Sequence, residues 1–361
     1  MTARLFEFEP NAAPVAVNER TARIADPGFG RVMTDHMAVA RWSDAAGWHD
    51  LKITARAPFS LDPATSVLHY AQEIFEGLKA YRTPDGVALF RPEANAARFN
   101  RSARRMAMAE LPEELFIASC RELVDVERDW IPDVEGGALY LRPFMIASEV
   151  FLGVKPATEY LYAVLATSVG IYWKGGLRAI SLWVSHDYCR AGPGGTGDAK
   201  CGGNYAASLA AQRDAFARGH DQVVFLDATE RRWIEECGGM NVFFVFDDGS
   251  IATPPLTGTI LPGITRESLM QLARDEGIVV REEMYAIDQW RADAESGRLV
   301  EAFACGTAAV VTPIGRVSGP DYSFEIGGGA IGQTTARLLK RLSDLQRGAG
   351  ADPHGWRHLV D

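Results

Sequence analysis

Lysine is scarce in this chain of 361 residues, although lysine and arginine together number 37. The lysines stand at Lys52, Lys79, Lys155, Lys174, Lys200 and Lys340. Any reaction that needs a lysine amine therefore has few candidates. Aspartate and glutamate number 47, and the net charge is −10. An acidic chain of this kind excludes a general nucleic-acid binder.

Cysteine is also sparse. The five cysteines are odd in number and widely spaced, which does not suit a disulfide framework. No C-x-x-C motif and no Cys/His pair at metal-ligand spacing occurs. The sequence therefore predicts neither a disulfide scaffold nor a metal site.

Long apolar runs are missing as well. The uncharged stretch from Tyr160 to Trp173 is shorter than the roughly 20 residues that a membrane helix needs. Glu7 and Glu9 interrupt the N-terminus, which has no apolar segment typical of a signal peptide. We expect a cytoplasmic globular protein with no membrane partner.

The periodic patterns mix strands and helices in both halves, which predicts an α/β class of the α+β type. Pro92 is expected to open a helix that runs to about Met108. The apolar segment from Tyr160 to Ile171 is typical of a strand buried on both faces. The segment from Ser66 to Tyr81 is expected to be a buried helix or turn.

A break at Lys174-Gly175-Gly176 separates two strong strands and marks the expected domain boundary. A smaller α/β domain over residues 1–173, a linker over 174–178 and a larger α/β domain over 179–361 follow from it. The larger domain is expected to carry Lys200.

The densest glycine segment runs from Gly192 to Gly203 and contains Lys200. Its first six residues match G-x-G-x-x-G, but the preceding strand ends near His186 and no helix begins before about Asn204, so a dinucleotide-binding site is disfavoured. The P-loop pattern fails because Cys201 follows the lysine where Ser or Thr is required. A flexible surface loop remains the alternative, although it would not explain a scarce lysine among the glycines.

Two further small-residue segments could bind an anion. Residues 256–266 lead into a helix, whose free N–H groups and positive dipole end attract anions. An ordinary loop-to-helix junction is the competing interpretation. The segment Cys305-Gly306-Thr307-Ala308-Ala309 follows a strand and offers a hydroxyl and close backbone approach.

Together these segments resemble the branched-chain amino acid aminotransferases, which are pyridoxal 5'-phosphate enzymes of fold type IV, related to the D-amino acid aminotransferases. The matching motifs, in the family's order, are LHYAQEIFEGLKAY (68–81), LFRPEANAARFNRSARRM (89–106), LYLRPF (139–144), GGTGDAKCGGNY (194–205), IEECGGMNVFF (234–244), GTILPGITR (258–266) and CGTAAVV (305–311).

The resemblance implies that Lys200 is the catalytic residue that forms the Schiff base with pyridoxal phosphate and moves the proton between substrate and cofactor. Glu236 corresponds to the carboxylate that faces the ring nitrogen, with Glu235 as the competing choice. In an extended segment these two side chains point to opposite faces, so only one can reach the ring. The other expected cofactor-binding residues are Arg91, Arg190, Tyr205, Thr259, Ile260 and Thr307.

The substrate pocket implied by the resemblance must accept an apolar side chain and also the γ-carboxylate of glutamate. Tyr140 and Arg142 share one face of a strand and would supply an aromatic wall and a cation. A buried Arg142 is costly without a partner, so an anion or a tyrosine hydroxyl should lie beside it. The full expected substrate set is Phe29, Tyr70, Phe75, Tyr140, Arg142, Tyr172, Thr307 and Ala308.

The chain departs from the family pattern at two places. Gly239 stands where many relatives have threonine, so a hydroxyl contact to the cofactor is absent or replaced by water. Ala309 and Thr312 stand where mammalian members carry a redox C-x-x-C, which excludes that kind of thiol regulation. Lys79, in the first motif, is interpreted as structural.

The resemblance therefore predicts a homodimeric enzyme of amino-acid biosynthesis. By ping-pong transfer it would move the amine of L-Leu, L-Ile or L-Val to 2-oxoglutarate, giving L-glutamate. A D-amino acid aminotransferase or an aminodeoxychorismate lyase of the same fold is the alternative, followed by a non-catalytic anion-binding module.

Overall fold

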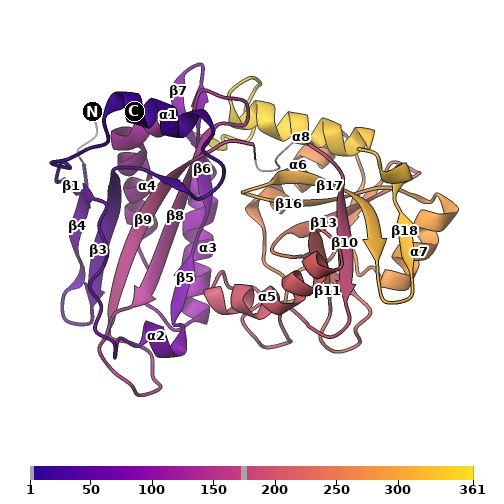
Figure 1. Ribbon diagram of the computed structural model, residues 1–361, viewed down its shortest axis with the longest axis horizontal. Helices are drawn as coiled ribbons and strands as arrows, with labels where there is room; N and C mark the ends of the chain where they lie inside the picture. The colour runs from indigo at the N-terminus through magenta and orange to yellow at the C-terminus, as the bar shows by residue number, and fades with distance from the viewer. Residues whose placement is uncertain (1–3, 172–176, 361) are drawn as a thin grey trace. The chain divides into compact units, whose positions relative to one another are not determined.

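The computed structural model describes residues 4–171 and 177–360, and the chain divides into two compact units (Figure 1). Unit 1 takes residues 1–174, 199–202 and 344–361, and unit 2 takes residues 175–198 and 203–343. This division differs from the expected boundaries, because the short segment with Lys200 and the C-terminal segment both belong to unit 1. Most of the expected linker, residues 174–176 of 174–178, lies outside the described residues.

Unit 1 is organised around a sheet that has ten strands within the described residues, in the order β1-β4-β3-β9-β8-β6-β7-β19, with β2 on β9 and β5 on β8. Its strands are β1 (Glu7–Phe8), β2 (Val32–Met33), β3 (His36–Ser43), β4 (Gly47–Ala55), β5 (Glu73–Phe75), β6 (Leu78–Thr83), β7 (Gly86–Phe90), β8 (Ala138–Ala147), β9 (Glu159–Val169) and β19 (Arg357–Val360). Its helices are α1 (Val17–Ala25), α2 (Val67–Tyr70), α3 (Pro92–Arg105) and α4 (Glu113–Glu127), followed by a 3-10 turn at Arg128–Trp130.

Helix α4 packs on β3 and β9, and α3 packs on α4, so the two helices carry much of the core of unit 1. Phe99 of α3, Phe116 of α4 and Tyr162 of β9 are fully buried and touch through their rings. The Tyr162 hydroxyl lies 2.8 Å from Ser119 Oγ, which satisfies a polar group in this apolar layer. Each such aromatic side chain contributes about 1.5–3 kcal/mol by leaving water.

Two sequence predictions for unit 1 are confirmed. Strand β9 is buried along almost its whole length between β3 and β8. Pro92 is the first residue of α3, which ends at Arg105.

The prediction of a helix or turn over the whole of Ser66–Tyr81 is wrong. Helix α2 ends after one turn, because Ala71 adopts a left-handed conformation at φ +50°. The chain then continues as β5 and β6, which both pair with β8. The apolar residues of this segment fill the sheet rather than a helix face.

Unit 2 contains a sheet that has nine strands within its described part, in the order β12-β11-β10-β17-β16-β13-β14-β15, with β18 on β17. Its strands are β10 (Ile180–Ser185), β11 (Gln222–Leu226), β12 (Ile234–Cys237), β13 (Asn241–Phe246), β14 (Ile251–Thr253), β15 (Val280–Glu282), β16 (Leu299–Gly306), β17 (Val310–Ser318) and β18 (Ser323–Glu325). Its helices are α5 (Gly202–Ala217), α6 (Ile264–Asp275) and α7 (Ile287–Ser296), with a 3-10 turn at Gly327–Gly329. Helix α8 (Gln333–Gln346) begins in unit 2 and runs past its last residue.

Helices α6 and α7 of unit 2 pack against β16, and β13 is buried throughout. Strand β12 places Glu235 and Glu236 next to each other in extended backbone. Among the described helices of both units, none is long and apolar enough to cross a membrane.

Candidate active site

Lys200 lies in unit 1, where its backbone is fixed on both sides. Its N–H donates to Ser102 Oγ of α3 at 2.9 Å, and its carbonyl accepts the N–H of Phe75 at 2.9 Å. The Lys200 Nζ lies 4.7 Å from the centre of the Phe75 ring. Glu73 accepts the N–H of Gly202, two residues further along. The glycine-rich segment around the lysine is therefore anchored to the sheet and to α3, and the surface-loop alternative is wrong.

Four residues expected to bind substrate form one cluster in unit 1. The Phe29 and Tyr140 rings meet edge to face at 5.1 Å between centroids. The Arg142 guanidinium lies 4.8 Å from the Phe75 ring centre, and its Nη2 donates to the Tyr140 hydroxyl at 3.0 Å. The expected tyrosine contact of Arg142 is thus confirmed. Its Nε is buried and has no hydrogen-bond partner in the described chain, so it can still bind an anion.

Gly77 gives this cluster its shape. A Cβ at Gly77 would lie 2.1 Å from the Tyr140 hydroxyl oxygen, so any other residue would displace the ring. The glycine of the first motif therefore makes room for the tyrosine of β8.

The two remaining expected aromatic residues are placed differently. Tyr70 lies on α2, is 40% exposed, and donates its hydroxyl hydrogen to the carbonyl of Leu152 in the loop of residues 148–158. Tyr172 lies outside the described residues.

The structure distinguishes two arginines on α3. Arg91 is the N-cap, with φ +51°, and its guanidinium lies 4.7 Å from the Trp356 ring centre. Arg98 is 3% exposed and donates from Nε and Nη2 to the two carboxylate oxygens of Glu76 at 2.7 and 2.8 Å. Sequence reasoning passed over this buried pair, although Asn95, Arg98 and Ser102 recur at the spacing of one helix face.

Glu76 connects Arg98 to the lysine. Burial would raise the pKa of Glu76, but Arg98, Lys200 and Asn95 together lower it below its ordinary value. The carboxylate is therefore ionised, although it is fully buried. Arg98 and Lys200 act on the same anion, so Arg98 lies on the Lys200 side of unit 1.

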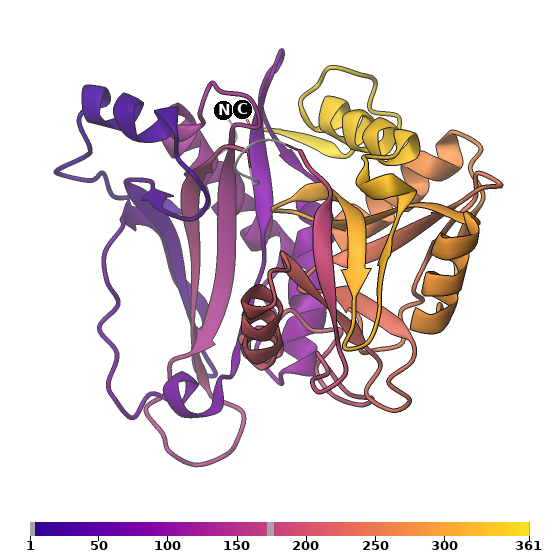
Figure 2. The same ribbon diagram turned by 45° about the vertical axis from the view of Figure 1, so that its right-hand side comes forward.

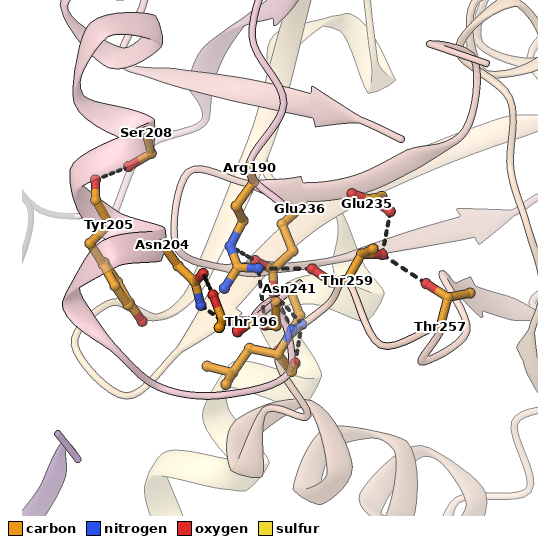
Figure 3. A network of polar contacts seen from close by, with 12 residues as sticks. Arg190, Thr196, Asn204, Tyr205, Ser208, Glu235, Glu236, Asn241, Thr257 and Thr259 are labelled. Carbon is orange, nitrogen blue, oxygen red and sulfur yellow. Dashed lines mark hydrogen bonds and ion pairs between the residues drawn. The ribbon is translucent and has the colours of Figure 1, made fainter. Parts of the chain in front are cut away.

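Arg190 and Glu236 form a buried ion pair in unit 2, with 2.5 Å between Nε and Oε2 (Figure 3). Glu236 Oε1 also accepts the N–H of Leu261 at 3.1 Å and the amide of Asn241 at 3.2 Å. Arg190 Nη1 donates to the carbonyl of Thr259 at 2.9 Å. One arginine thus joins the carboxylate to the turn before α6.

Glu235 points to the other face of β12 (Figure 3). Its Oε1 accepts the hydroxyl hydrogen of Thr259, whose Oγ1 also lies 2.9 Å from Thr257 Oγ1. The expectation that the two glutamates face opposite ways is confirmed. Thr259 is held from both faces, by Arg190 at its carbonyl and by Glu235 at its hydroxyl.

Gly197 of the glycine segment packs directly on this turn. A Cβ at Gly197 would lie 2.4–2.6 Å from the backbone O, Cα and C of Thr259. We expect Gly197→Ala to lower the free energy of unfolding by about 1–3 kcal/mol, because backbone atoms cannot move aside cheaply. Gly203→Ala is the matched control, since nothing lies within 4 Å of its Cβ position and it lies in α5. Urea unfolding of the two variants measures this difference in unfolding free energy. Equal stability of Gly197→Ala and Gly203→Ala would contradict the close approach of Gly197 to Thr259.

Tyr205 lies in the first turn of α5 and its ring borders Gly239. A Cβ at Gly239 would come within 3.2 Å of Tyr205 Cε1, which is tighter than ordinary van der Waals contact. The glycine that replaces the usual threonine thus leaves space for the tyrosine ring.

Thr307 and Ala308 form the tip of the β16–β17 hairpin, and Val310 after them adopts φ +59°. Cys305 is the register partner of Asn241, which hydrogen-bonds Glu236. Register therefore places the hairpin tip near the Glu236 carboxylate within unit 2. Ile260 follows Thr259 and is buried like it.

Each unit, taken by itself, supplies groups of the kind that bind pyridoxal phosphate. Unit 1 supplies a lysine amine beside an aromatic ring and a buried arginine. Unit 2 supplies a buried carboxylate held by an arginine, which suits a protonated ring nitrogen. Its turn at Gly258 (φ +90°) precedes the N-cap of α6, where N–H groups suit a phosphate.

Comparison with known proteins gives the class. The model of the family "Amino-transferase class IV" matches residues 73–317. The chain belongs to the class IV aminotransferase family, and its cofactor is pyridoxal phosphate.

Among its relatives, the chain is 56% identical to the probable branched-chain-amino-acid aminotransferase of Streptomyces coelicolor, with 100% of each chain covered. It is 46% identical to the branched-chain-amino-acid transaminase 1 of Bacillus subtilis, with 91% and 93% covered. A solved structure of the Escherichia coli branched-chain amino acid aminotransferase aligns with a TM-score of 0.74 at 28% identity, over 90% of this chain and 100% of that one. A second solved branched-chain amino acid aminotransferase, with pyridoxamine 5'-phosphate, aligns with a TM-score of 0.74 at 29% identity, over 90% and 99%.

Proposed function

We propose that this enzyme transfers the amine of L-leucine, L-isoleucine or L-valine to 2-oxoglutarate. The observation that carries the proposal is the cluster of Phe29, Phe75, Tyr140 and Arg142 in unit 1. Aromatic rings accommodate an apolar side chain, and the unpartnered Nε of Arg142 can donate a hydrogen bond to the γ-carboxylate of glutamate. The names of the relatives at 46–56% identity support the same substrates.

Lys200 is the proposed catalytic residue. When bound, pyridoxal phosphate supplies an electron-accepting ring that stabilises negative charge at the substrate Cα. Lys200 would bind the cofactor covalently, and its amine would then carry the proton between Cα and the cofactor's C4′ carbon. The backbone contacts to Ser102 and Phe75 fix the part of the chain from which this amine extends.

Glu236 is the proposed partner of the ring nitrogen, and Arg190 positions it. The N–H groups of Thr259 and Ile260 and the hydroxyl of Thr307 would bind the phosphate. Tyr205 would hydrogen-bond the phenolic oxygen of the cofactor. The Thr307-Ala308 tip would hold the substrate α-carboxylate through backbone N–H groups, and Tyr70 and Tyr172 remain proposed wall residues.

For the arginine that neutralises the phosphate, Arg98 is supported better than Arg91, which the family resemblance suggested. Arg98 is buried on the Lys200 side of unit 1, whereas Arg91 stacks on Trp356. We expect Arg98→Lys to raise the dissociation constant of the cofactor by about tenfold or more, because a lysine amine cannot keep the two-nitrogen pairing with Glu76 and also present a guanidinium N–H to the phosphate.

Arg91→Lys, at the N-cap of the same helix, is the matched variant. We expect less than about a threefold effect, since the charge is kept and the guanidinium lies over the Trp356 ring. Fluorescence titration of the cofactor-free variants measures both constants. A larger effect of the Arg91 variant would identify Arg91 as the phosphate-binding arginine instead.

The substrate class is tested by following glutamate formation from 2-oxoglutarate with a panel of amine donors. L-Leucine, L-isoleucine and L-valine should all serve, and the D-enantiomers should not. Activity confined to D-amino acids would identify a D-amino acid aminotransferase instead, and pyruvate release from aminodeoxychorismate would identify the lyase.

A cytoplasmic homodimer is the proposed assembly. Helix α2 lies beside the loop of residues 148–158 at one end of unit 1 (Figure 2). Both segments carry exposed apolar side chains. They are Leu68, Tyr70, Val150, Phe151, Leu152 and Val154. Exposed apolar side chains concentrated in two neighbouring segments are typical of a protein interface.

We expect Val154→Glu to shift the enzyme from dimer to monomer, because Val154 is 87% exposed in this loop and a buried charge opposes association. Val279→Glu is the control at an exposed valine of unit 2 and should leave the mass unchanged. Sedimentation velocity distinguishes the two. A dimer that persists in Val154→Glu contradicts this interface.

A further inference from the structure

A second pocket, of about 250 Å³, opens within unit 2 on the face of β12 that carries Glu235. Its walls include Pro193, Asp227, Trp233, Glu235, Pro254 and Met284. Neither Arg190 nor Glu236 is among the described residues that line it. Two of its lining residues, Thr259 and Ile260, belong to the turn proposed to bind the phosphate, but the pocket opens on the face of β12 opposite the proposed ring-nitrogen partner Glu236.

Thr259 separates the two faces (Figure 3). Its carbonyl accepts from Arg190 on the Glu236 face, and its hydroxyl donates to Glu235 on the pocket face. The turn whose N–H groups are proposed to bind the phosphate thus forms part of the pocket wall through Thr259 and Ile260.

Glu235, one of the lining residues, leaves one of its carboxylate oxygens without a partner. The residue is only 6% exposed, and its Oε2 is buried without a hydrogen-bond partner among the described residues. A buried carboxylate oxygen without a partner costs about 1–3 kcal/mol or more. Such a cost is recovered when a ligand donates a hydrogen bond to that oxygen.

The charge around the pocket selects the sign of the ligand. Asp227 accepts backbone N–H groups from Thr229, Glu230, Arg232 and Trp233. Burial would raise the pKa of Asp227, but these hydrogen bonds lower it, so the carboxylate stays ionised. With Glu230 also in the wall, the pocket disfavours anions and attracts a cation.

The remaining walls select the body of the ligand. Pro254, Pro255, Ile234, Ile260 and Met284 present apolar surface around the carboxyl group. Apolar walls with one convergent polar group are typical of small-molecule sites. A ligand that fits both properties is a short hydrocarbon chain that ends in a protonated amine.

We propose that this pocket is a second binding site, for small aliphatic ammonium ions, in which Glu235 Oε2 accepts the ammonium N–H. Burial is the main cause that raises the pKa of Glu235, and Glu236 and Asp227 raise it further. An ammonium ion beside the carboxyl group would favour its ionised form and offset that desolvation.

The test uses the holoenzyme labelled with [¹³C-methyl]methionine and the probe N,N-dimethylbutylamine, a tertiary amine that cannot condense with the cofactor aldehyde. The methyl resonance of Met284, assigned with Met284→Leu, should shift saturably. Met145 is buried in β8 of unit 1, away from the pocket residues, so its resonance is the control and should not move. No saturable shift at Met284, or an equal shift at Met145, would overturn the proposal.

Three comparisons test the ligand class and the role of Glu235. Hexan-2-ol and hexanoate, of similar size, should give no response at the concentrations where the amine saturates. Glu235→Gln should weaken amine binding by about tenfold or more, because the charge is lost and the shape is kept. Glu230→Gln, at the exposed rim, should change it less than about threefold. An equal response to the alcohol, or equal affinities of the two variants, would contradict the proposal.

A variant that fills the pocket tests amine binding without changing the carboxyl group of Glu235. Met284 is 50% exposed at the pocket, so Met284→Trp can place an indole in the space without disturbing the core. Calorimetric titration with the same amine should then show no binding. Undiminished binding to Met284→Trp would locate the amine elsewhere.

Discussion

Replacing Lys200 with alanine should lower kcat for transamination by about 10⁴-fold or more, because both the covalent attachment and the proton carrier are lost. The fold should survive, since Lys200 is held through its backbone N–H and carbonyl, which alanine retains. Steady-state glutamate formation and thermal unfolding of the same preparation measure the two effects. Residual activity within tenfold of wild type would show that Lys200 is not the catalytic residue.

Lys79 is the competing amine in unit 1. Burial and the nearby Arg347 lower the pKa of Lys79 to about 7, so much of it is unprotonated at neutral pH. Lys79 lies within strand β6, where it pairs with Tyr140 of β8. Lys200, by contrast, lies in the glycine-rich segment. Lys79→Met should therefore retain the covalent cofactor, which borohydride reduction and peptide mapping can locate.

Replacing Glu236 with glutamine should lower kcat by about 10²–10³-fold, with a smaller change in KM. The amide cannot keep the ring nitrogen protonated, and this interaction strengthens as charge moves onto the ring. The change also leaves Arg190 buried without its anion, which should cost about 3–5 kcal/mol of unfolding free energy.

Glu235→Gln is the matched control, one residue away on the other face of β12. Glutamine can still accept the Thr259 hydroxyl hydrogen, so we expect a loss of less than about tenfold in kcat. If Glu235→Gln were the more damaging change, the assignment of the two carboxylates would be reversed.

Most of the local contacts in the candidate site could be predicted from the motifs, because each motif concentrates unusual residue types over a few positions. The opposite directions of Glu235 and Glu236 followed from strand geometry alone, and so did the shared face of Tyr140 and Arg142. The contact of Arg142 with a tyrosine hydroxyl followed from the cost of burying an unpartnered cation.

The pairings between residues far apart in the chain could not be predicted from the sequence. The antiparallel pairing of β19 with β7 joins residues far apart in the chain, and no local pattern indicates it. The Glu76–Arg98 pair was missed because α3 carries many arginines, and burial alone distinguishes Arg98 among them. The strands after Ala71 were missed because a left-handed residue, not a proline or glycine, ends α2.

Peptide mapping of the holoenzyme after borohydride reduction, before and after addition of L-leucine, shows directly which lysine carries the cofactor. We expect the reduced cofactor on Lys200 in the resting enzyme, its loss from Lys200 with L-leucine, and its return when 2-oxoglutarate is added. Attachment at Lys79, or attachment at Lys200 that L-leucine leaves unchanged, would show that Lys200 is not the catalytic lysine of this reaction.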